Sequence, residues 1–242
     1  MLKVSAVPIL KDNYVFIPTN GQTKECVIID PGQADAVKSF ILKEHLRPRG
    51  ILLTHHHWDH IGGAQELKKA FDVKIYAPLK EQKLIDFADV YLQENDFVFE
   101  AGMQFRIIDL PGHTMGHIAY LEEKQKWLFS GDVLFSLGCG RIFDGTIEDH
   151  YKSLGKIKAL DPSTIIHCTH EYTEMNLKFC LEKFPEDPAL KNFAQHVQAL
   201  RSQGKPTVPF PLNQELELNP FLKAKNEADF IALREERNNF KT

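Results

Sequence analysis

The sequence has few cysteines, and they follow no recognisable pattern. Cys26, Cys139, Cys168 and Cys180 are the only four in 242 residues. They form no CxxC pair and no compact spacing, which argues against a zinc ribbon and against a disulfide framework. We therefore expect each to be a small buried side chain rather than a nucleophile, in the reducing cytoplasm.

The chain also lacks a strong charge of one sign and a long apolar run. Its 29 basic and 33 acidic residues leave a net charge of -4, and no basic run stands out. A nucleic acid or an anionic membrane surface is therefore not expected as a partner. No apolar stretch is long enough to cross a bilayer, and residues 1–17 lack the basic and long apolar regions of a signal peptide. We predict a soluble, cytoplasmic monomer.

Short apolar runs alternate with helical patterns over most of the chain. With 242 residues and 43% hydrophobic content, the chain can bury one substantial core and carry a small accessory domain. Strands mixed with helices over this length predict a layered α/β arrangement, with helices covering sheets. The predicted strands are 4–9, 14–18, 26–29, 50–53, 73–76, 105–110, 118–121, 127–129 and 164–168, and the predicted helices are 34–46, 63–71 and 146–160.

The character of the sequence changes after His170, where no further strand is predicted. Asp187 and Pro188 form a helix start, and apolar residues then recur at helical spacing until Gly204. Asn226 and Asp229 cap a last helix, and residues 206–211 are predicted to be a connector. We place a domain boundary near Thr173, with a catalytic domain over 1–173 and a helical domain over 174–242. The alternative is that these helices extend the first domain.

A cluster of metal-ligand types follows the apolar run 51–53. The segment Thr54–His60 reads THHHWDH. Imidazole and carboxylate together suit borderline cations such as zinc, and four such side chains in six residues cannot all reach one ion without strain. In an extended loop, His55 and His57 point to the same side, which leaves Asp59 and His60 for a second ion. The segment therefore predicts two metal ions.

Three other predicted strands each end in a further ligand type. Strand 105–110 leads to His113, strand 127–129 to Asp132, and strand 164–168 to His170. Any one of these alone is more typical of an ordinary histidine or a turn aspartate. Four strand ends that deliver histidine and aspartate indicate one shared site.

These motifs carry a resemblance to a known family. The pattern THxHxDH, followed by GHT, SGD and a late histidine, resembles the metallo-β-lactamase superfamily. The segments GCGR at 138–141, HEYT at 170–173 and NPF at 219–221 resemble glyoxalase II, the hydroxyacylglutathione hydrolase family, and the likeness covers nearly the whole chain. It implies a four-layer αββα sandwich with a small C-terminal all-helical domain.

The resemblance also implies roles for individual residues. His55, His57 and His113 would bind one metal ion, Asp59, His60 and His170 the other, and Asp132 would bridge them. Asp59 and Asp132 would thus lie at the catalytic centre. Zinc is the first choice of metal, with iron or manganese as alternatives. The implied substrate contacts are Arg141, Phe143, Tyr172, Lys223, Lys225 and Asn226.

Phe143 departs from the family pattern, which often has tyrosine at this position. One hydroxyl contact to the substrate peptide would therefore be missing.

The activity implied is hydrolysis of S-(2-hydroxyacyl)glutathione, and of S-D-lactoylglutathione first, to glutathione and D-lactate. This is the second step of methylglyoxal detoxification. A hydroxide bridging two divalent ions would be the nucleophile, since such ions deprotonate water near neutral pH.

Alternative functions are an iron-dependent glutathione persulfide dioxygenase, another thioester hydrolase of the superfamily, and a non-catalytic metal-binding protein. The complete second ligand set argues against the dioxygenase, which needs one metal. An open hydroxide site would have no purpose in a non-catalytic protein.

The remaining histidines and the metal-loop tryptophan receive ordinary interpretations. His56 should face away from the metals, and His117 should either orient the His113 loop or pack against it. Trp58 is predicted to be a packing residue that fixes the metal loop. The others are predicted to be surface or core residues: His45, His150, His167 and His196.

Overall fold

The first sheet combines an antiparallel hairpin with four parallel strands. In the computed structural model, which describes residues 1–240, its strands run in the order β1-β2-β3-β4-β5-β6. The β1–β2 and β2–β3 pairs are antiparallel, and the pairs from β3 to β6 are parallel. The bounds are β1 Leu2–Ile9, β2 Asn13–Asn20, β3 Glu25–Ile29, β4 Arg47–Leu52, β5 Lys74–Pro78 and β6 Val90–Leu92.

The second sheet is largely antiparallel and has the order β14-β13-β10-β9-β8-β7. Only β10 and β13 run parallel in it, and a small separate hairpin, β11–β12, follows β10. The bounds are β7 Phe97–Glu100, β8 Met103–Asp109, β9 Ile118–Glu122, β10 Trp127–Gly131, β11 Leu134–Phe135, β12 Gly138–Cys139, β13 Ile165–Cys168 and β14 Phe210–Pro211.

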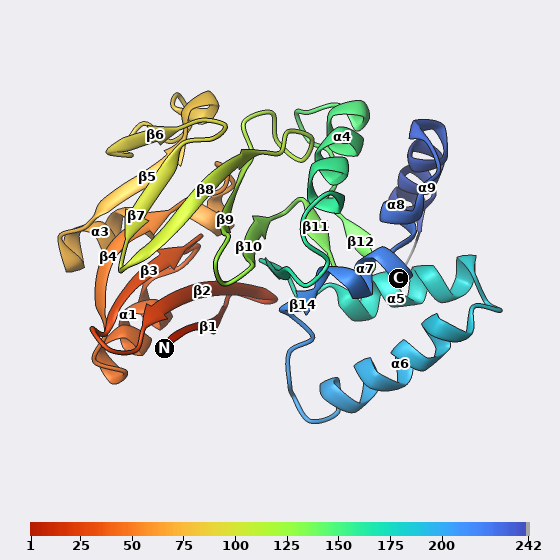
Figure 1. Ribbon diagram of the computed structural model, residues 1–242, viewed down its shortest axis with the longest axis horizontal. Coiled ribbons are helices and arrows are strands. Elements are labelled where there is room, and N and C mark those ends of the chain that lie inside the picture. The colour runs from red at the N-terminus through yellow and green to blue at the C-terminus, as the bar shows by residue number, and fades with distance from the viewer. Residues whose placement is uncertain (241–242) are drawn as a thin grey trace.

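Helices cover the outer face of each sheet (Figure 1). In the first half, α1 and α3 lie on the first sheet, and in the second half α4 and the C-terminal helices lie on the second. The bounds are α1 Ala34–Lys43, α2 Trp58–Ile61, α3 Ala64–Phe71, η1 Leu79–Glu81, α4 Ile147–Lys158, α5 Thr173–Lys183, α6 Pro188–Arg201, α7 Leu212–Leu218, α8 Pro220–Lys223 and α9 Glu227–Asn239.

Alternation along single strands explains why each sheet is covered on both faces. On β4, Ile51 packs with the helices of the first layer, whereas Leu52 belongs to the core between the two sheets. On β10, Phe129 faces that same inner core, and Leu128 faces the C-terminal helices. Successive strand residues point to opposite faces of a sheet, so both faces of each sheet are apolar and must be covered. Two sheets packed together, each with helices on its outer face, meet this requirement in four layers. The predicted αββα sandwich is confirmed.

The C-terminal helices share one hydrophobic cluster with the second sheet. Leu177 on α5, Phe221 on α8 and Phe230 on α9 belong to the same cluster as Leu128 and Ile166 of the sheet. The predicted start of α6 is confirmed. Asp187 is its N-cap and accepts from the backbone N–H groups of Ala189 and Leu190, and Pro188 is its first residue. The domain division at Thr173 stays a prediction.

No helix within residues 1–240 combines the length and apolar composition needed to span a membrane.

All nine predicted strands are present, but two details of the prediction are wrong. Residues 206–211 were expected to be a connector, yet Phe210 and Pro211 form β14, antiparallel to β13. Two residues are too few to show alternation, and proline is tolerated because the strand is at an edge. The helix predicted over 34–46 ends at Lys43, because His45 adopts a left-handed conformation with φ of 54°. Helices α2, α5, α7 and α8, the single turn η1, and strands β6, β7, β11 and β12 were not predicted.

A buried carboxylate joins the C-terminal helices to the small hairpin. Glu215 on α7 is fully buried and accepts from the backbone N–H of Leu137 (2.7 Å), from Ser136 Oγ (3.1 Å) and from Asn219 Nδ2 (2.9 Å). Burial raises the pKa of Glu215 to about 7, although these hydrogen bonds act to lower it. The folded chain therefore binds this proton more tightly than the unfolded chain does.

Replacing Glu215 by Gln should remove one source of pH dependence. Because the pKa is raised in the folded state, stability should fall as pH rises from about 4.5 to about 7. Across this window, the free energy of unfolding of Glu215→Gln minus that of the parent should increase with pH, by roughly 1.4 kcal/mol per unit of pKa shift. Urea unfolding at several pH values measures the difference. A difference that stays constant with pH contradicts this assignment.

Candidate metal centre and substrate cavity

The four strand ends singled out in the sequence meet at one place. His55 and His57 lie in the loop after β4, and Asp59 and His60 lie on the short helix α2 that follows. His113 lies between β8 and β9, Asp132 directly follows β10, and His170 follows β13. The turn at Gly131 depends on glycine, because its φ is 49° and a Cβ would lie 2.5 Å from Thr54 Oγ1.

Three histidines form the first ligand cluster. Nδ1 of His57 lies 3.0 Å from Nε2 of His55 and 3.0 Å from Nε2 of His113. These three nitrogens lie close enough together to hold one metal ion. Three nitrogen ligands at such spacing are typical of a zinc-type site with an open position.

Asp59, His60 and His170 form the second cluster. Oδ2 of Asp59 lies 3.7 Å from Nε2 of His60 and 3.5 Å from Nε2 of His170. This mixed carboxylate and imidazole set also suits a divalent cation.

Asp132 lies between the two clusters. Its Oδ2 is 3.5 Å from Nε2 of His113 and 3.2 Å from Nε2 of His170, and its Oδ1 is 3.4 Å from Nε2 of His60. One carboxylate thus faces ligands of both clusters, as a bridging ligand must.

In three of the histidines, Nδ1 contacts an acceptor outside the clusters, which leaves Nε2 to face the metal position. Nδ1 of His113 lies 2.7 Å from the carbonyl oxygen of Arg141, which can only accept, so this nitrogen carries the proton. Likewise Nδ1 of His60 faces Asp30 at 3.0 Å, and Nδ1 of His170 faces Asp12 at 2.9 Å. In each case Nε2 is the free ligand atom. A carboxylate or carbonyl behind a histidine is the usual arrangement for metal ligands.

Two inward-facing atoms have no other partner. Nε2 of His60 and Oδ1 of Asp132 are buried and have no hydrogen-bond partner within residues 1–240. Unsatisfied buried polar atoms cost free energy, and a cation between them would remove that cost. The residues therefore fit a pair of metal ions.

The two clusters differ in protonation in the metal-free protein. Burial lowers the pKa of His55 well below its ordinary value, and burial together with His113 lowers that of His57 to about 4. Burial would also lower the pKa of His170, but the carboxylates of Asp132 and Asp12 raise it to about 9. The first cluster is thus neutral near pH 7, whereas an ion entering the second must displace a proton.

The N-terminal hairpin loop supports the second cluster. Besides the contact of Asp12 with His170, Nδ2 of Asn13 donates to Oδ2 of Asp59 at 2.9 Å. Two ligands that are 111 residues apart in the chain are thereby held by consecutive residues, Asp12 in the turn and Asn13 at the start of β2.

The neighbours of the ligands partly match their predicted roles. His56 faces away from the metal clusters, as expected, and contacts Glu81. His117 accepts from the backbone N–H of Asp132 at 3.2 Å and stacks on His55, and its own backbone bonds to Leu110 and Thr114 of the His113 loop, so it both packs at the site and helps to hold that loop. The prediction for Trp58 is wrong: its side chain is 68% exposed, because α2 turns its other face toward the metals. Cys26, Cys139, Cys168 and Cys180 are free and buried, as predicted.

A cavity of about 470 Å³ opens over the clusters. It brings the ligands together with three predicted substrate residues, Arg141, Phe143 and Tyr172. The Tyr172 ring stacks on His170 at 4.6 Å, and the Phe143 ring stands edge-on to His57 at 5.0 Å. The other residues lining the cavity are Phe135, Cys139, Met175, Asn176, Arg234, Arg237, Asn238 and Phe240.

Three predicted substrate residues do not line this cavity. Lys223 and Lys225 line a separate cavity of about 400 Å³, next to Lys183 and Asp229. Asn226 is the N-cap of α9 and accepts from the backbone N–H of Asp229. Asn226 thus lies at the start of α9, whereas the residues of α9 that line the metal-side cavity come from its later turns.

Two arginines of α9 were missed by the sequence analysis. Arg234 is buried and donates from Nη1 to the carbonyl of Cys139 at 2.9 Å, while its Nε has no partner within residues 1–240. Arg237 donates to Oδ1 of Asn176 at 3.2 Å. Their spacing of three places both on one helix face, a signal that the sequence did contain.

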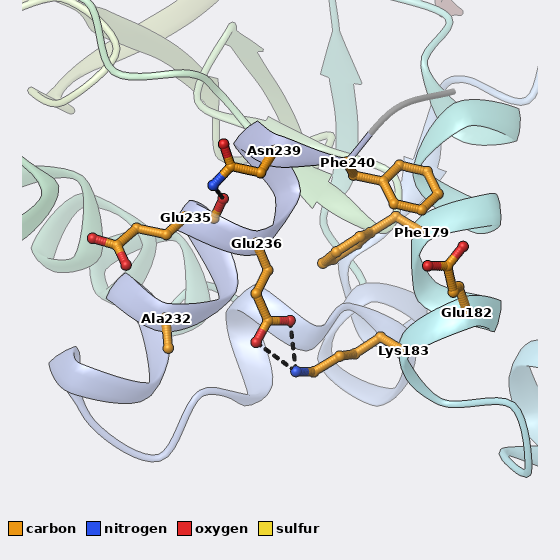
Figure 2. Close-up of a pocket in the computed structure, with 8 residues that line it drawn as sticks. All are labelled: Phe179, Glu182, Lys183, Ala232, Glu235, Glu236, Asn239 and Phe240. Carbon is orange, nitrogen blue, oxygen red and sulfur yellow. Dashed lines mark hydrogen bonds and ion pairs between the residues drawn. The ribbon is translucent and has the colours of Figure 1, made fainter.

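A larger hollow of about 800 Å³ lies between α5 and α9 (Figure 2). Lys183 is paired with Glu236 across it, and Phe179 and Phe240 form one wall. No residue of either metal cluster lines it. The chemistry therefore belongs to the smaller cavity.

Comparisons with known proteins agree with this geometry. Residues 13–170 match the family model of the metallo-beta-lactamase superfamily, and residues 171–240 match that of the hydroxyacylglutathione hydrolase C-terminus. A hydroxyacylglutathione hydrolase of Bdellovibrio bacteriovorus is 50% identical over 243 residues, which cover 97% of each chain.

Solved structures with the same fold include the BLEG-1 B3 metallo-beta-lactamase, with a TM-score of 0.71 and 26% identity over 91% of this chain and 99% of that one. TTHA1623 in a di-iron-bound form has a TM-score of 0.65 and 24% identity over 89% of this chain and 98% of that one. The fold, the paired ligand clusters and the close relatives all lead to one conclusion. This chain belongs to the hydroxyacylglutathione hydrolase family of the metallo-β-lactamase superfamily.

Proposed function

We propose that this protein hydrolyses S-(2-hydroxyacyl)glutathione, with S-D-lactoylglutathione as the main substrate, to glutathione and a 2-hydroxy acid. The observation that carries the proposal is a pair of ligand clusters sharing Asp132, beneath a cavity lined by arginines. The 50% identity to a hydroxyacylglutathione hydrolase, over nearly the whole of both chains, supports this choice of substrate.

Two divalent ions are proposed, with His55, His57 and His113 holding one and Asp59, His60 and His170 the other. Asp132 would touch both ions and offset their mutual repulsion. Zinc is our first choice, and iron or manganese are alternatives that this ligand set also accepts. When bound, such a pair supplies Lewis-acid polarisation of a carbonyl and a nucleophile from water at neutral pH.

The residues around the ions suit a thioester. Hydrolysis adds the oxygen of water to the carbonyl carbon and breaks the C–S bond, and the sulfur leaves as a thiolate. A thiol has a pKa of about 8.5, so the thiolate leaves without a dedicated general acid. Asp59 lines the cavity and is held by Asn13, which allows it to accept a hydrogen bond from the attacking water.

The arginines of the cavity suit the glutathione moiety. Glutathione carries two carboxylates, and guanidinium groups bind carboxylates through paired hydrogen bonds. Arg141, Arg234 and Arg237 line the cavity beyond the ligands, so they can hold the peptide while the thioester reaches the clusters. The roles of Lys223, Lys225 and Asn226 stay predictions, as do the monomeric state and the cytoplasmic location.

The direct test is turnover of S-D-lactoylglutathione by the metal-loaded protein, followed by thiol release. Oxygen consumption with glutathione persulfide is measured on the same sample. We expect thiol release without oxygen uptake. Oxygen uptake without thioester hydrolysis would instead establish the dioxygenase alternative.

The second prediction concerns metal content. The purified protein should hold close to two ions per chain. His170→Ala should lose mainly one of them and His57→Ala the other. Asp132→Ala should be worse than either, because it serves both clusters. Elemental analysis after dialysis measures the ratio, and full activity with a single bound ion contradicts the two-ion site.

The third prediction compares Arg141 with Lys223. Arg141 lines the metal-side cavity, so Arg141→Ala should raise KM by about tenfold to hundredfold and change kcat less, since a charged hydrogen bond contributes roughly 1.5–3 kcal/mol. Lys223→Ala is the matched control, because it removes one cation from the other cavity. A larger rise in KM for Lys223→Ala than for Arg141→Ala would favour the assignment made from the sequence.

A further inference from the structure

Glu81 is a buried carboxylate to which the metal clusters give no role. It ends η1, the single helical turn after β5, and its side chain is only 3% exposed. The backbone there is held by Leu84 and Ile85, whose N–H groups donate to the carbonyl of Glu81. A carboxylate so buried is costly unless it is paired.

The two oxygens of Glu81 contact two different metal-bearing loops. Oε1 accepts a hydrogen bond from Thr114 Oγ1, and Thr114 directly follows the ligand His113. Oε2 lies 3.1 Å from Nδ1 of His56, which stands between the ligands His55 and His57. Neither atom has a hydrogen-bond partner within residues 1–240, so each is the nearest polar group available to the other. Glu81 thus joins the two loops that supply the first cluster.

The loop of His113 is shaped to receive this side chain. A Cβ at Gly116 would lie 2.2 Å from Cγ of Glu81. The missing side chain at Gly116 lets the turn pack directly on the stem of Glu81. The side chain of Glu81 is therefore closely packed against the His113 loop.

The second cluster is held by other residues. Asp12, Asn13 and Asp30 contact His170, Asp59 and His60 respectively. Glu81 contacts Thr114 and His56, neighbours of the first cluster only. Asp30 also accepts from the backbone N–H and Oγ1 of Thr54, which precedes His55, so it supports both clusters. Asp12 and Asn13 contact the second cluster alone, and Glu81 contacts neighbours of the first alone.

We propose that Glu81 is a positioning residue for the first metal ion, which fixes the loop of His55 and His57 against the loop of His113 and thereby sets the affinity of that cluster alone. The proposal rests on the proposed two-metal site. Loss of a residue that supports metal ligands lowers metal affinity by about 10-fold to 100-fold, and we expect an effect of this size.

The experiment isolates each cluster in turn. His170→Ala should retain mainly the first ion, and His57→Ala mainly the second. Glu81→Ala is added to each background, and zinc binding is measured by calorimetry at one pH. We expect about a 10-fold to 100-fold loss of affinity in the His170→Ala background and little change in the His57→Ala background. Equal losses in both backgrounds, or no loss in either, overturn the proposal.

Two variants separate positioning from general stability. Glu122 is another buried carboxylate, on β9, and its Oε2 accepts from the backbone of Gln125 at 2.6 Å. Glu122→Ala in the His170→Ala background should leave zinc affinity unchanged, and a loss matching that of Glu81→Ala overturns the proposal. His56→Ala removes the half-buried partner of Glu81 and leaves the buried carboxylate in place. It serves as the test if Glu81→Ala fails to fold. It should produce the same selective loss, and unchanged first-ion affinity in His56→Ala overturns the proposal.

Failure of the two-metal site and failure of the role of Glu81 give different results. If neither single-cluster background binds zinc, then the two-metal site itself is wrong and Glu81 has nothing to position. If both bind zinc and Glu81→Ala changes neither affinity, then the metal site stands and only the role of Glu81 is wrong.

Discussion

The central interaction of this structure is the contact of three imidazole rings with one buried carboxylate, that of Asp132, at a site able to hold cations. Nε2 of His113, His60 and His170 all face Asp132, and their other nitrogens are already bound to acceptors. Such a cluster is unfavourable by itself and becomes favourable when cations lie within it. The site is therefore best understood as one half of an electrostatic arrangement that metal ions complete.

The sandwich provides the rigidity that this arrangement needs. Its ligands come from the ends of β4, β8, β10 and β13, strands that belong to two different sheets. The core between the sheets fixes these ends relative to each other, because interiors pack as densely as crystals and do not deform continuously. A small set of partners then fixes the individual side chains, with Asp12 and Asn13 behind one cluster, Glu81 behind the other, and Asp30 in contact with His60 and with Thr54 beside His55.

The C-terminal helices contribute both to the core and to the cavity. Phe221 and Phe230 pack in the same cluster as the second sheet, while Arg234 and Arg237 of α9 reach the metal side. Arg237 also lies 5.9 Å from the rings of Phe179 and Phe240, so its guanidinium is held from the apolar side as well. The same helices thus cover the sheet and place two guanidinium groups at the cavity over the metal clusters, where we propose that they bind glutathione.

Elements with local signals could be predicted from the sequence alone. Short apolar runs identified nine strands, caps at Thr146, Asp187 and Asn226 located three helices, and the ligand types at four strand ends indicated one shared site. The resemblance to a family then assigned the ligands to two ions and named the substrate. These inferences need only neighbouring residues or recurring motifs.

Features that depend on residues far apart in the chain could be found only in the folded structure. The edge strand β14 exists because β13 offers a partner, and two residues carry no pattern of their own. Lys223 follows a family motif yet lines a different cavity, while Arg234 and Arg237, without a motif, line the one above the metals. The support from Glu81 joins segments about 25 and 33 residues away. Periodicity reports which face of an element is buried, but only the packing of distant elements determines what lies against that face.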